Sequence, residues 1–286
     1  ACSADPPLRD SILPLPDGGV VVLSGGRLFR IAADGQGVSR LPGAGIRAAA
    51  VADGMLYRGG ADGKVVRVAL DRPADPGQLL LEAGAPLLFV RWGATGLAAG
   101  TAARLLRVST ASGAEGHPDL KVKAVRYAAS AQGRFAWNGG EGLFLLAAPV
   151  VDPVQLADDA LDFVFCGEDL YWSAPDGRVR RRTEHGDTHL VKDFYPPDNS
   201  PLAVLGATPD GRYLFGVTEP ATGQPLFLSL DRQDGRIFMA PAPIGSTALA
   251  VSLDYRVRYF LAAGVLHVHG FQQDERGPLR QVTLPE

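Results

Sequence analysis

The stretch SGGRLFRI, residues 24–31, decides the fold of this chain. The apolar segment before it, VVVL at residues 20–23, predicts a β-strand. The Gly25-Gly26 pair predicts a tight turn, because glycine adopts positive φ angles without steric cost. The apolar residues that follow predict a second strand running back beside the first. The stretch therefore predicts a β-hairpin.

Similar hairpins recur along the whole sequence. They lie at residues 59–68 (GGADGKVVRV), 99–108 (AGTAARLLRV), 138–146 (NGGEGLFLL), 173–181 (SAPDGRVRR), 218–230 (TEPATGQPLFLSL) and 262–270 (AAGVLHVHG). Together with residues 24–31 they form seven units at intervals of roughly 36 to 47 residues, a period typical of repeat architectures. Each interval holds about four strand-like segments, as in one propeller blade. The sequence therefore predicts an all-β fold, a seven-bladed β-propeller with four antiparallel strands per blade.

Turn signals divide the chain into an N-terminal tail and seven blades. The tail is residues 1–10 and the propeller domain is residues 11–286. The predicted blades are residues 11–42, 46–84, 86–122, 123–158, 160–194, 202–243 and 246–286. The first segment of each blade is the most apolar, so we expect it to be the innermost strand, covered on both faces. Because the first and last blades each hold four segments, we expect the ring to close by packing. The alternative is that the tail around residues 7–10 adds to the last blade.

Several turns resemble those of a known group of propellers. LPDGG at residues 15–19 and TPDGR at residues 208–212 are similar to the Pro-Asp-Gly turn of YVTN-type and related bacterial propellers, and AQGR at residues 131–134 is a degenerate copy. The resemblance covers residues 11–286 and implies the propeller fold. It implies little about function, since such propellers include scaffolds, lactonases and binding proteins.

The charge of the chain argues against nucleic-acid binding. The net charge is −3 and the pI is about 6.0, so we expect no general affinity for nucleic acid or anionic membranes. No apolar run approaches the ~18 residues that a membrane-spanning helix needs. Nucleophile-elbow, His-Glu-x-x-His, Walker and EF-hand motifs are absent from the sequence. We therefore expect no cofactor and no catalytic residues.

The first residues resemble the mature start of a bacterial lipoprotein. Ala1-Cys2-Ser3 precedes a polar segment that contains prolines. In that interpretation Cys2 carries a lipid, which is the protein's only link to a membrane, and the tail tethers the domain in the periplasm. The alternative is that Cys2 is an ordinary cysteine. Cys166 ends an apolar strand, which favours a buried free thiol over a disulfide with Cys2.

Histidine and arginine motifs offer weak candidates for a site. His267 and His269 share one face of a strand, but no motif supplies further metal ligands, so we expect no metal. His185 and His189 flank a turn, and we expect both to be solvated. The basic run at residues 178–182 is either a phosphate or acidic-partner site or, as we favour, a charged strand that discourages edge pairing.

Tryptophans are more easily explained by packing. Trp92, Trp137 and Trp172 lie within predicted strands, and we expect them to fill the space between blades. Stacking against a ligand is the alternative role. Neither histidines, arginines nor tryptophans therefore assign a function.

Acidic residues provide the stronger pattern. In a propeller, the loops between the second and third strands share one face with the connections between blades. That rim collects Asp62, Glu141, Asp158, Asp159, Asp176, Asp198 and Glu219, with Tyr195 and Asn199 on the longest connection. Loops on a rigid scaffold commonly carry binding groups, and an acidic rim would attract a basic partner. The alternative is that these residues are ordinary solvent-exposed turn residues with no binding role.

These observations favour a non-catalytic, envelope-associated, monomeric propeller that binds another protein through its rim. One version is an immunity or inhibitor protein that blocks a toxin or hydrolase. The first alternative is a lactonase- or hydrolase-type enzyme with carboxylates at the channel mouth, for which Asp162, Asp158 and Glu141 are the candidates. The second alternative is a scaffold of an envelope assembly machine.

Overall fold

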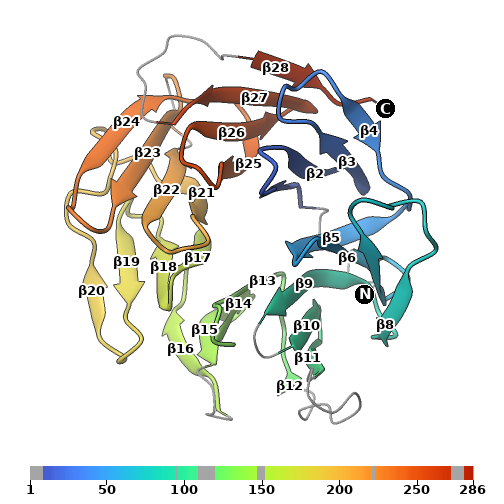
Figure 1. The fold of residues 1–286 in the computed structure, drawn as a ribbon. Helices are drawn as coiled ribbons and strands as arrows, with labels where there is room; N and C mark the ends of the chain where they lie inside the picture. The colour runs from blue at the N-terminus through green and yellow to red at the C-terminus, as the bar shows by residue number, and fades with distance from the viewer. Residues whose placement is uncertain are drawn as a thin grey trace.

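Seven four-stranded antiparallel sheets stand around a common axis and form a β-propeller (Figure 1). The computed structural model describes residues 9–93, 96–108, 120–146, 152–218, 220, 223–271 and 280–285. Within these ranges every regular element is a strand, and no helix is long and apolar enough to cross a membrane. The architecture predicted from the repeats is confirmed.

The first four blades use the first half of the chain. Blade 1 contains β1 (Ser11–Pro14), β2 (Val20–Ser24), β3 (Arg27–Ile31) and β4 (Val38–Arg40). Blade 2 contains β5 (Ile46–Ala52), β6 (Met55–Gly60), β7 (Lys64–Ala69) and β8 (Gln78–Glu82). Blade 3 contains β9 (Leu87–Gly93), β10 (Gly96–Thr101), β11 (Arg104–Val108) and β12 (Leu120–Lys121). Blade 4 contains β13 (Arg126–Ala129), β14 (Phe135–Gly139), β15 (Gly142–Leu146) and β16 (Val154–Ala157).

The last three blades follow the same order. Blade 5 contains β17 (Asp162–Cys166), β18 (Asp169–Ser173), β19 (Val179–Arg182) and β20 (Thr188–Leu190). Blade 6 contains β21 (Leu202–Ala207), β22 (Tyr213–Thr218), β23 (Leu226–Asp231) and β24 (Ile237–Pro241). Blade 7 contains β25 (Ser246–Val251), β26 (Val257–Ala262), β27 (Val265–Gly270) and β28 (Arg280–Thr283).

The hairpin at residues 24–31 shows how the sequence sets each blade. Strands β2 and β3 pair with Leu23 opposite Leu28 and Ser24 opposite Arg27, which leaves Gly25 and Gly26 as a two-residue turn. Both glycines have positive φ angles, 55° and 76°, as turns that match the twist of the strands require. The Gly-Gly pair therefore fixes the register of the two strands.

The core consists of seven apolar clusters, each built from two neighbouring blades. One cluster, for example, joins Val21 and Leu23 of blade 1 to Leu56 and Val68 of blade 2. The second strands are the most buried, and every residue of β22 is buried. Our expectation that the first strands are covered on both faces is wrong. β5 is mostly half-buried, because first strands line the central channel, which stays open to solvent.

The ring closes without exchanging a strand between its ends. In the part of the chain that the structure describes, blade 1 consists of β1–β4 and blade 7 of β25–β28. The two blades share an apolar cluster that includes Ile31 and Val20 on one side and Leu266 and Val268 on the other. The predicted closure by packing is confirmed, and the residues of the tail that are described, Arg9 and Asp10, add no strand to blade 7.

Two kinds of loop share one face of the ring, as expected. The amide of Ala61, in the β6–β7 turn, donates to the carbonyl of Gly45 in the connection between blades 1 and 2 (2.8 Å). The amide of Leu161, in the connection between blades 4 and 5, likewise donates to Ser173 O at the end of β18 (2.9 Å). We call this side the rim face and the other side the opposite face.

Candidate functional site

The structure places the described members of the predicted acidic rim on the rim face. Asp62, Glu141 and Asp176 lie in or beside turns between second and third strands, whereas Asp158, Asp159, Tyr195, Asp198 and Asn199 lie on connections between blades. Glu219 and Cys2 lie outside the described residues. The loops that carry these side chains thus surround one end of the channel, although the side chains are spread over blades 2, 4, 5 and 6.

Several carboxylates on the rim face have local partners within the chain, and two of them are paired with cations. Glu141 forms an ion pair with Lys123 at 2.6 Å, and Asp176 forms one with Arg180 at 2.7 Å. The hydrogen bond from Arg180 lowers the pKa of Asp176. Asp198 accepts hydrogen bonds from the amide and hydroxyl of Ser200, which lower its pKa. These carboxylates already stabilise turns or bind cations of the chain itself, so they are less available to a partner protein.

Asp158 and Asp159 keep their charge available. Both are exposed on the connection between blades 4 and 5, and neither forms an ion pair with any residue that the structure describes. Asp158 accepts a hydrogen bond from Gln155 Nε2 (2.9 Å), which also donates to the carbonyl of Glu141 (2.8 Å). Asp158 and Asp159 therefore contribute acidic charge, without an ion pair to a described residue, between blades 4 and 5, as Asp62 does on blade 2 and Asp198 does between blades 5 and 6.

Two exposed apolar side chains lie on the rim face, at the start of blades 4 and 5. Val125 directly precedes the inner strand of blade 4 and is 58% exposed, and Leu161 precedes that of blade 5 and is 45% exposed. Their backbones are fixed by hydrogen bonds, since the Val125 amide donates to Asn138 O (2.8 Å) and the Leu161 amide to Ser173 O (2.9 Å). Asn138 Nδ2 also donates to Ala160 O (3.2 Å), which ties the two connections together.

We call Val125 and Leu161 the apolar patch. Sequence analysis missed it, because an isolated valine or leucine before an apolar strand looks like part of that strand. The signal that could have revealed it is position, since both residues occupy the last place of an inter-blade connection, where polar turn residues are expected. An apolar centre next to charged residues is the usual composition of a protein interface.

A buried ion cluster of Arg9, Arg126 and Asp162 lies at the channel mouth, and Arg126 and Asp162 directly follow the two residues of the apolar patch in sequence. The carboxylate of Asp162, 1% exposed, accepts hydrogen bonds from Arg9 Nη2 (3.2 and 3.3 Å) and from the amide of Leu205 (2.7 Å). Arg126 of blade 4 pairs with the same carboxylate. Burial, with the nearby Arg9 guanidinium, lowers the pKa of Arg126. Asp162 thereby joins its own blade to the tail, blade 4 and blade 6.

The channel is hollow at this mouth and deeper inside. A cavity of about 240 Å³ at the mouth is lined by Arg9, Arg47, Val125 and Arg126, among others. A second cavity of about 470 Å³ is lined by first strands, including Ala50 of β5. The channel mouth thus combines arginine side chains with the Asp162 carboxylate, the one candidate carboxylate that lies there.

The three carboxylates considered for an enzyme do not converge. Asp158 and Glu141 lie near each other on the outer rim through Gln155, whereas Asp162 is buried among arginines. Among the described residues, no group of three or more His, Cys, Asp or Glu side chains is placed to hold a metal ion. The Asp162 carboxylate already accepts hydrogen bonds from Arg9 and a backbone amide and forms an ion pair with Arg126. These contacts fix it in place and stabilise its charge, so it is poorly placed to act as a base.

The histidines of the β19–β20 turn and the arginines of the basic run show no sign of a ligand site. His185 and His189 are exposed around the β19–β20 turn. In the basic run, Arg180 pairs with Asp176, Arg181 with Asp169 at 2.5 Å, and Arg178 lies over the ring of Tyr195 at 4.5 Å. The run is therefore a strand whose cations have local partners. Our interpretation that it discourages edge pairing is wrong, because β19 lies between β18 and β20 and is not an edge strand.

His269 differs from the expectation of a partly exposed residue. It is 6% exposed, and burial, with the nearby Arg258 guanidinium, lowers its pKa to about 4. The ring packs edge-on against Phe260 at 5.3 Å. His267, on the same face of β27, is half-buried, and burial lowers its pKa. His269 is therefore a buried residue of blade 7, because its side of the strand faces blade 6.

Tryptophans and Cys166 behave as predicted. Trp92 of blade 3 stacks on Tyr57 of blade 2 with ring centroids 5.0 Å apart. Trp137 belongs to the cluster between blades 3 and 4, and Trp172 to the cluster between blades 4 and 5. Cys166 is a buried free thiol, and burial raises its pKa to about 11.

Comparison with solved structures finds propellers. The chain aligns with PorZ, described as an essential bacterial surface component of the type-IX secretion system of Porphyromonas gingivalis, at 14% identity and a TM-score of 0.67. The alignment covers 97% of this chain but 38% of PorZ, so the chain corresponds to part of that protein.

Two further structures have similar folds. A Bacteroides uniformis protein provisionally named a 6-phosphogluconolactonase aligns at 12% identity and a TM-score of 0.62, covering 96% of this chain and 95% of that one. The computationally designed Ika8 protein aligns at 13% identity and a TM-score of 0.63, and the alignment covers 98% of this chain and 88% of Ika8. No family model matches the sequence, and no curated protein sequence matches it significantly. At these identities the similarities establish the fold alone.

Proposed function

We propose that this chain is a non-catalytic propeller that binds a partner protein through the rim face, with the apolar patch at the centre of the contact. The observation that carries the proposal is the pair of exposed side chains, Val125 and Leu161, on backbones fixed by hydrogen bonds. A rigid apolar pair loses little conformational entropy on binding, which favours affinity.

The neighbouring charges indicate the chemistry of the partner. Asp158 and Asp159 lie on the same connection as Leu161, and neither forms an ion pair with a described residue, although the charge of Asp159 also acts on Arg180. A complementary surface would place lysine or arginine side chains against them and an apolar side chain against the patch. The partner is therefore a protein with a basic rim around an apolar anchor.

The finer version of the proposal concerns place and role. In this version the chain is a monomeric periplasmic protein, tethered to a membrane through a lipid on Cys2. In that setting the rim face would block a basic toxin or hydrolase, or serve as a scaffold in an envelope assembly. The burial of Asp162 among arginines gives the lactonase-type alternative less support.

Affinity capture with matched variants tests the proposal. The wild-type chain, a Val125→Ser/Leu161→Ser double variant and an Asp158→Lys/Asp159→Lys double variant would be immobilised and exposed to extract from the source organism. We expect one protein to be captured by the wild type and lost by both variants. Each apolar truncation at an interface centre should weaken binding by at least about fivefold, or ~1 kcal/mol.

The control is a substitution on the opposite face. Leu253→Ser changes an exposed leucine between β25 and β26, and capture should be unaffected. A protein captured equally by all four chains binds elsewhere and would contradict the rim-face assignment. Turnover of a lactone by the wild-type chain, lost in Asp162→Asn, would instead favour the enzyme.

A further inference from the structure

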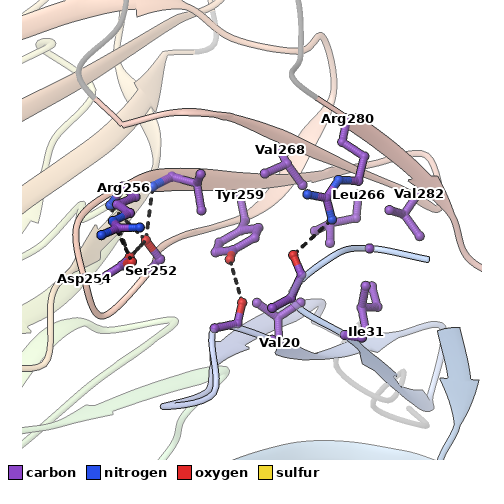
Figure 2. Close-up of a pocket in the computed structure, with 16 residues that line it drawn as sticks. Val20, Ile31, Ser252, Asp254, Arg256, Tyr259, Leu266, Val268, Arg280 and Val282 are labelled. Atoms are coloured by element: carbon purple, nitrogen blue, oxygen red, sulfur yellow. Dashed lines mark hydrogen bonds and ion pairs between the residues drawn. The ribbon is translucent and has the colours of Figure 1, made fainter. Parts of the chain in front are cut away.

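The seam between blades 7 and 1 contains an internal space that packing does not fill. A cavity of about 200 Å³ lies between β26, β27 and β28 on one side and β2 and β3 on the other. Figure 2 shows Leu266, Val268 and Val282 above the space and Val20 and Ile31 below it. These five side chains are aliphatic and favour an apolar molecule over bound water, whereas Ser252, Asp254, Arg256, Tyr259 and Arg280 add polar groups to the lining.

Two hydrogen bonds cross the seam beside this cavity (Figure 2). The hydroxyl of Tyr259 donates to the carbonyl of Gly18 (3.4 Å), and Arg280 Nη1 donates to the carbonyl of Ala33 (3.1 Å). Both donors come from blade 7 and both acceptors from blade 1. The cavity is therefore held open by fixed contacts as well as by the shape of its walls.

The two arginines at the cavity differ in their electrostatic partners. Arg256, at one end of the view, lies 3.3 Å from the carboxylate of Asp254. Arg280, at the other end, forms no ion pair with any carboxylate that the structure describes, and its hydrogen bond goes to a neutral carbonyl. Asp34, in the turn beside Ala33, turns its carboxylate to the amide of Gln36 (2.9 Å). Arg280 thus provides, next to an apolar space, a positive charge that no carboxylate in the described ranges pairs with.

The place of Arg280 is built into the turn beneath it. Gly35 has a φ of +68°, and a Cβ there would lie 2.1 Å from Arg280 Nη1. Only glycine allows the guanidinium to lie across this turn, and glycine also relieves the strain of the positive φ. The arginine is therefore positioned by blade 1 although it belongs to blade 7.

We propose that the seam cavity binds a small amphipathic anion, with an apolar body of about the size of a benzene ring between the blades and a carboxylate on Arg280. The volume supports the size, since a 150 Å³ apolar cavity is known to admit benzene. The aliphatic side chains select the apolar body, and the Arg280 guanidinium, which forms no ion pair with a described carboxylate, selects the negative head group. Such a ligand would stabilise the closed ring, because it contacts both terminal blades.

Titration calorimetry with two probes of opposite charge tests this site. Phenylacetate and 2-phenylethylamine share a ring and differ in the charge of the head group. At fixed ionic strength we expect phenylacetate to bind the wild-type chain about tenfold more tightly, since a charge-assisted hydrogen bond adds affinity. Arg280→Gln should remove this preference, whereas Arg236→Gln, at an exposed turn of blade 6, should leave it unchanged.

Filling the cavity provides the second arm. Val257→Phe should place a ring in the space and abolish binding of both probes, and Ala33→Leu should cover the entrance from an exposed position that folding tolerates. Circular dichroism would confirm that each variant is folded before titration. No binding of phenylacetate to the wild type at millimolar concentration would overturn the proposal. So would binding that survives both filling variants, or a preference that persists in Arg280→Gln.

Discussion

The two faces of blade 7 are packed by different side chains. The face toward blade 6 is aromatic, and Phe227 of blade 6 meets Phe260 of blade 7 edge to face with centroids 5.7 Å apart. Arg258 is fully buried among these rings, 4.9 Å from the centroid of Phe227, and donates to the carbonyl of Phe271 (3.1 Å). The face toward blade 1 is mostly aliphatic and contains the seam cavity.

The difference between aromatic and aliphatic packing shows how side chains fill the space between neighbouring blades. Neighbouring sheets diverge away from the channel (Figure 1), so the gap between them is wedge-shaped and large side chains are needed to fill its outer part. Aromatic rings bury 150–250 Å² each and supply this volume between blades 6 and 7. Mostly aliphatic side chains meet across the seam between blades 7 and 1, and they leave a cavity at its opposite-face end, between β2 and β3 on one side and β26, β27 and β28 on the other. The following predictions test this comparison.

Removing a ring from the aromatic face should have the largest effect. Phe227→Ala deletes a fully buried ring that contacts Phe260 and lies against Arg258. We expect a loss of about 3–5 kcal/mol in the free energy of unfolding, measured by urea denaturation. Ile31→Val on the seam should cost about 0.5–1.5 kcal/mol. Equal losses at the two positions would contradict the comparison.

Acid should weaken the same face through His269. Its folded-state pKa, about 4, lies below the ordinary 6.5, so between these values the unfolded chain binds a proton that the folded chain excludes. Stability is therefore full above pH 6.5 and is lost as the pH falls toward 4, by up to about 3 kcal/mol. Urea denaturation across this range should show the loss in the wild type.

His269→Gln is the control for this pH dependence. It removes the titrating group, so the stability of the variant should change much less between pH 6.5 and 4. The carboxylates whose pKa values are lowered, such as Asp231 and Asp254, titrate below this window and should not obscure the result. An unchanged slope in the variant would assign the acid sensitivity to another group.

Adding a methyl group should change the free energy of unfolding in opposite directions on the two faces of blade 7. Val282→Ile extends a side chain that lines the seam cavity and should stabilise the fold by about 0.8 kcal/mol, the value of one buried methylene. Val217→Ile adds the same group to the filled cluster between blades 6 and 7 and should cost about 1–3 kcal/mol. Thermal unfolding of both variants measures the difference, and a loss at Val282 would mean that the seam is already full.

The smallest effect should come from the tail. Thr247 Oγ1 of blade 7 donates to the carboxylate of Asp10 (2.7 Å), just before β1, so the bond crosses the seam at the rim face. Thr247→Val keeps the shape and removes the donor, and because the site is exposed we expect a loss of ~0.5 kcal/mol. A loss as large as that of Phe227→Ala would show that the tail, rather than packing, closes the ring.

Local sequence patterns predicted most of the fold. Glycine and aspartate turns located the hairpins, the repeat interval gave seven blades, and the apolar segments identified the strands. The same patterns identified Cys166 as buried and the three tryptophans as packing residues between blades. Each of these predictions concerns residues close in sequence, or identical positions of adjacent repeats, where local geometry is decisive.

The candidate site could be predicted only in part. Sequence order placed Asp158 and Asp159 on the rim face, but the ion pairs that neutralise Glu141 and Asp176 depend on side-chain directions. The exposure of Val125 and Leu161 also depends on how the connections turn at the channel mouth. Neither property follows from a residue's place in the repeat.

By itself, the sequence determined the number of blades and their strands, because turn residues and alternating apolar residues act over a few neighbours. Only the tertiary structure brought Arg9 to Asp162, 153 positions apart, and set Arg280 over Gly35 beside an unfilled seam. Those contacts join blades that are distant in the chain, so their formation depends on the curvature of the closed ring and on no local pattern.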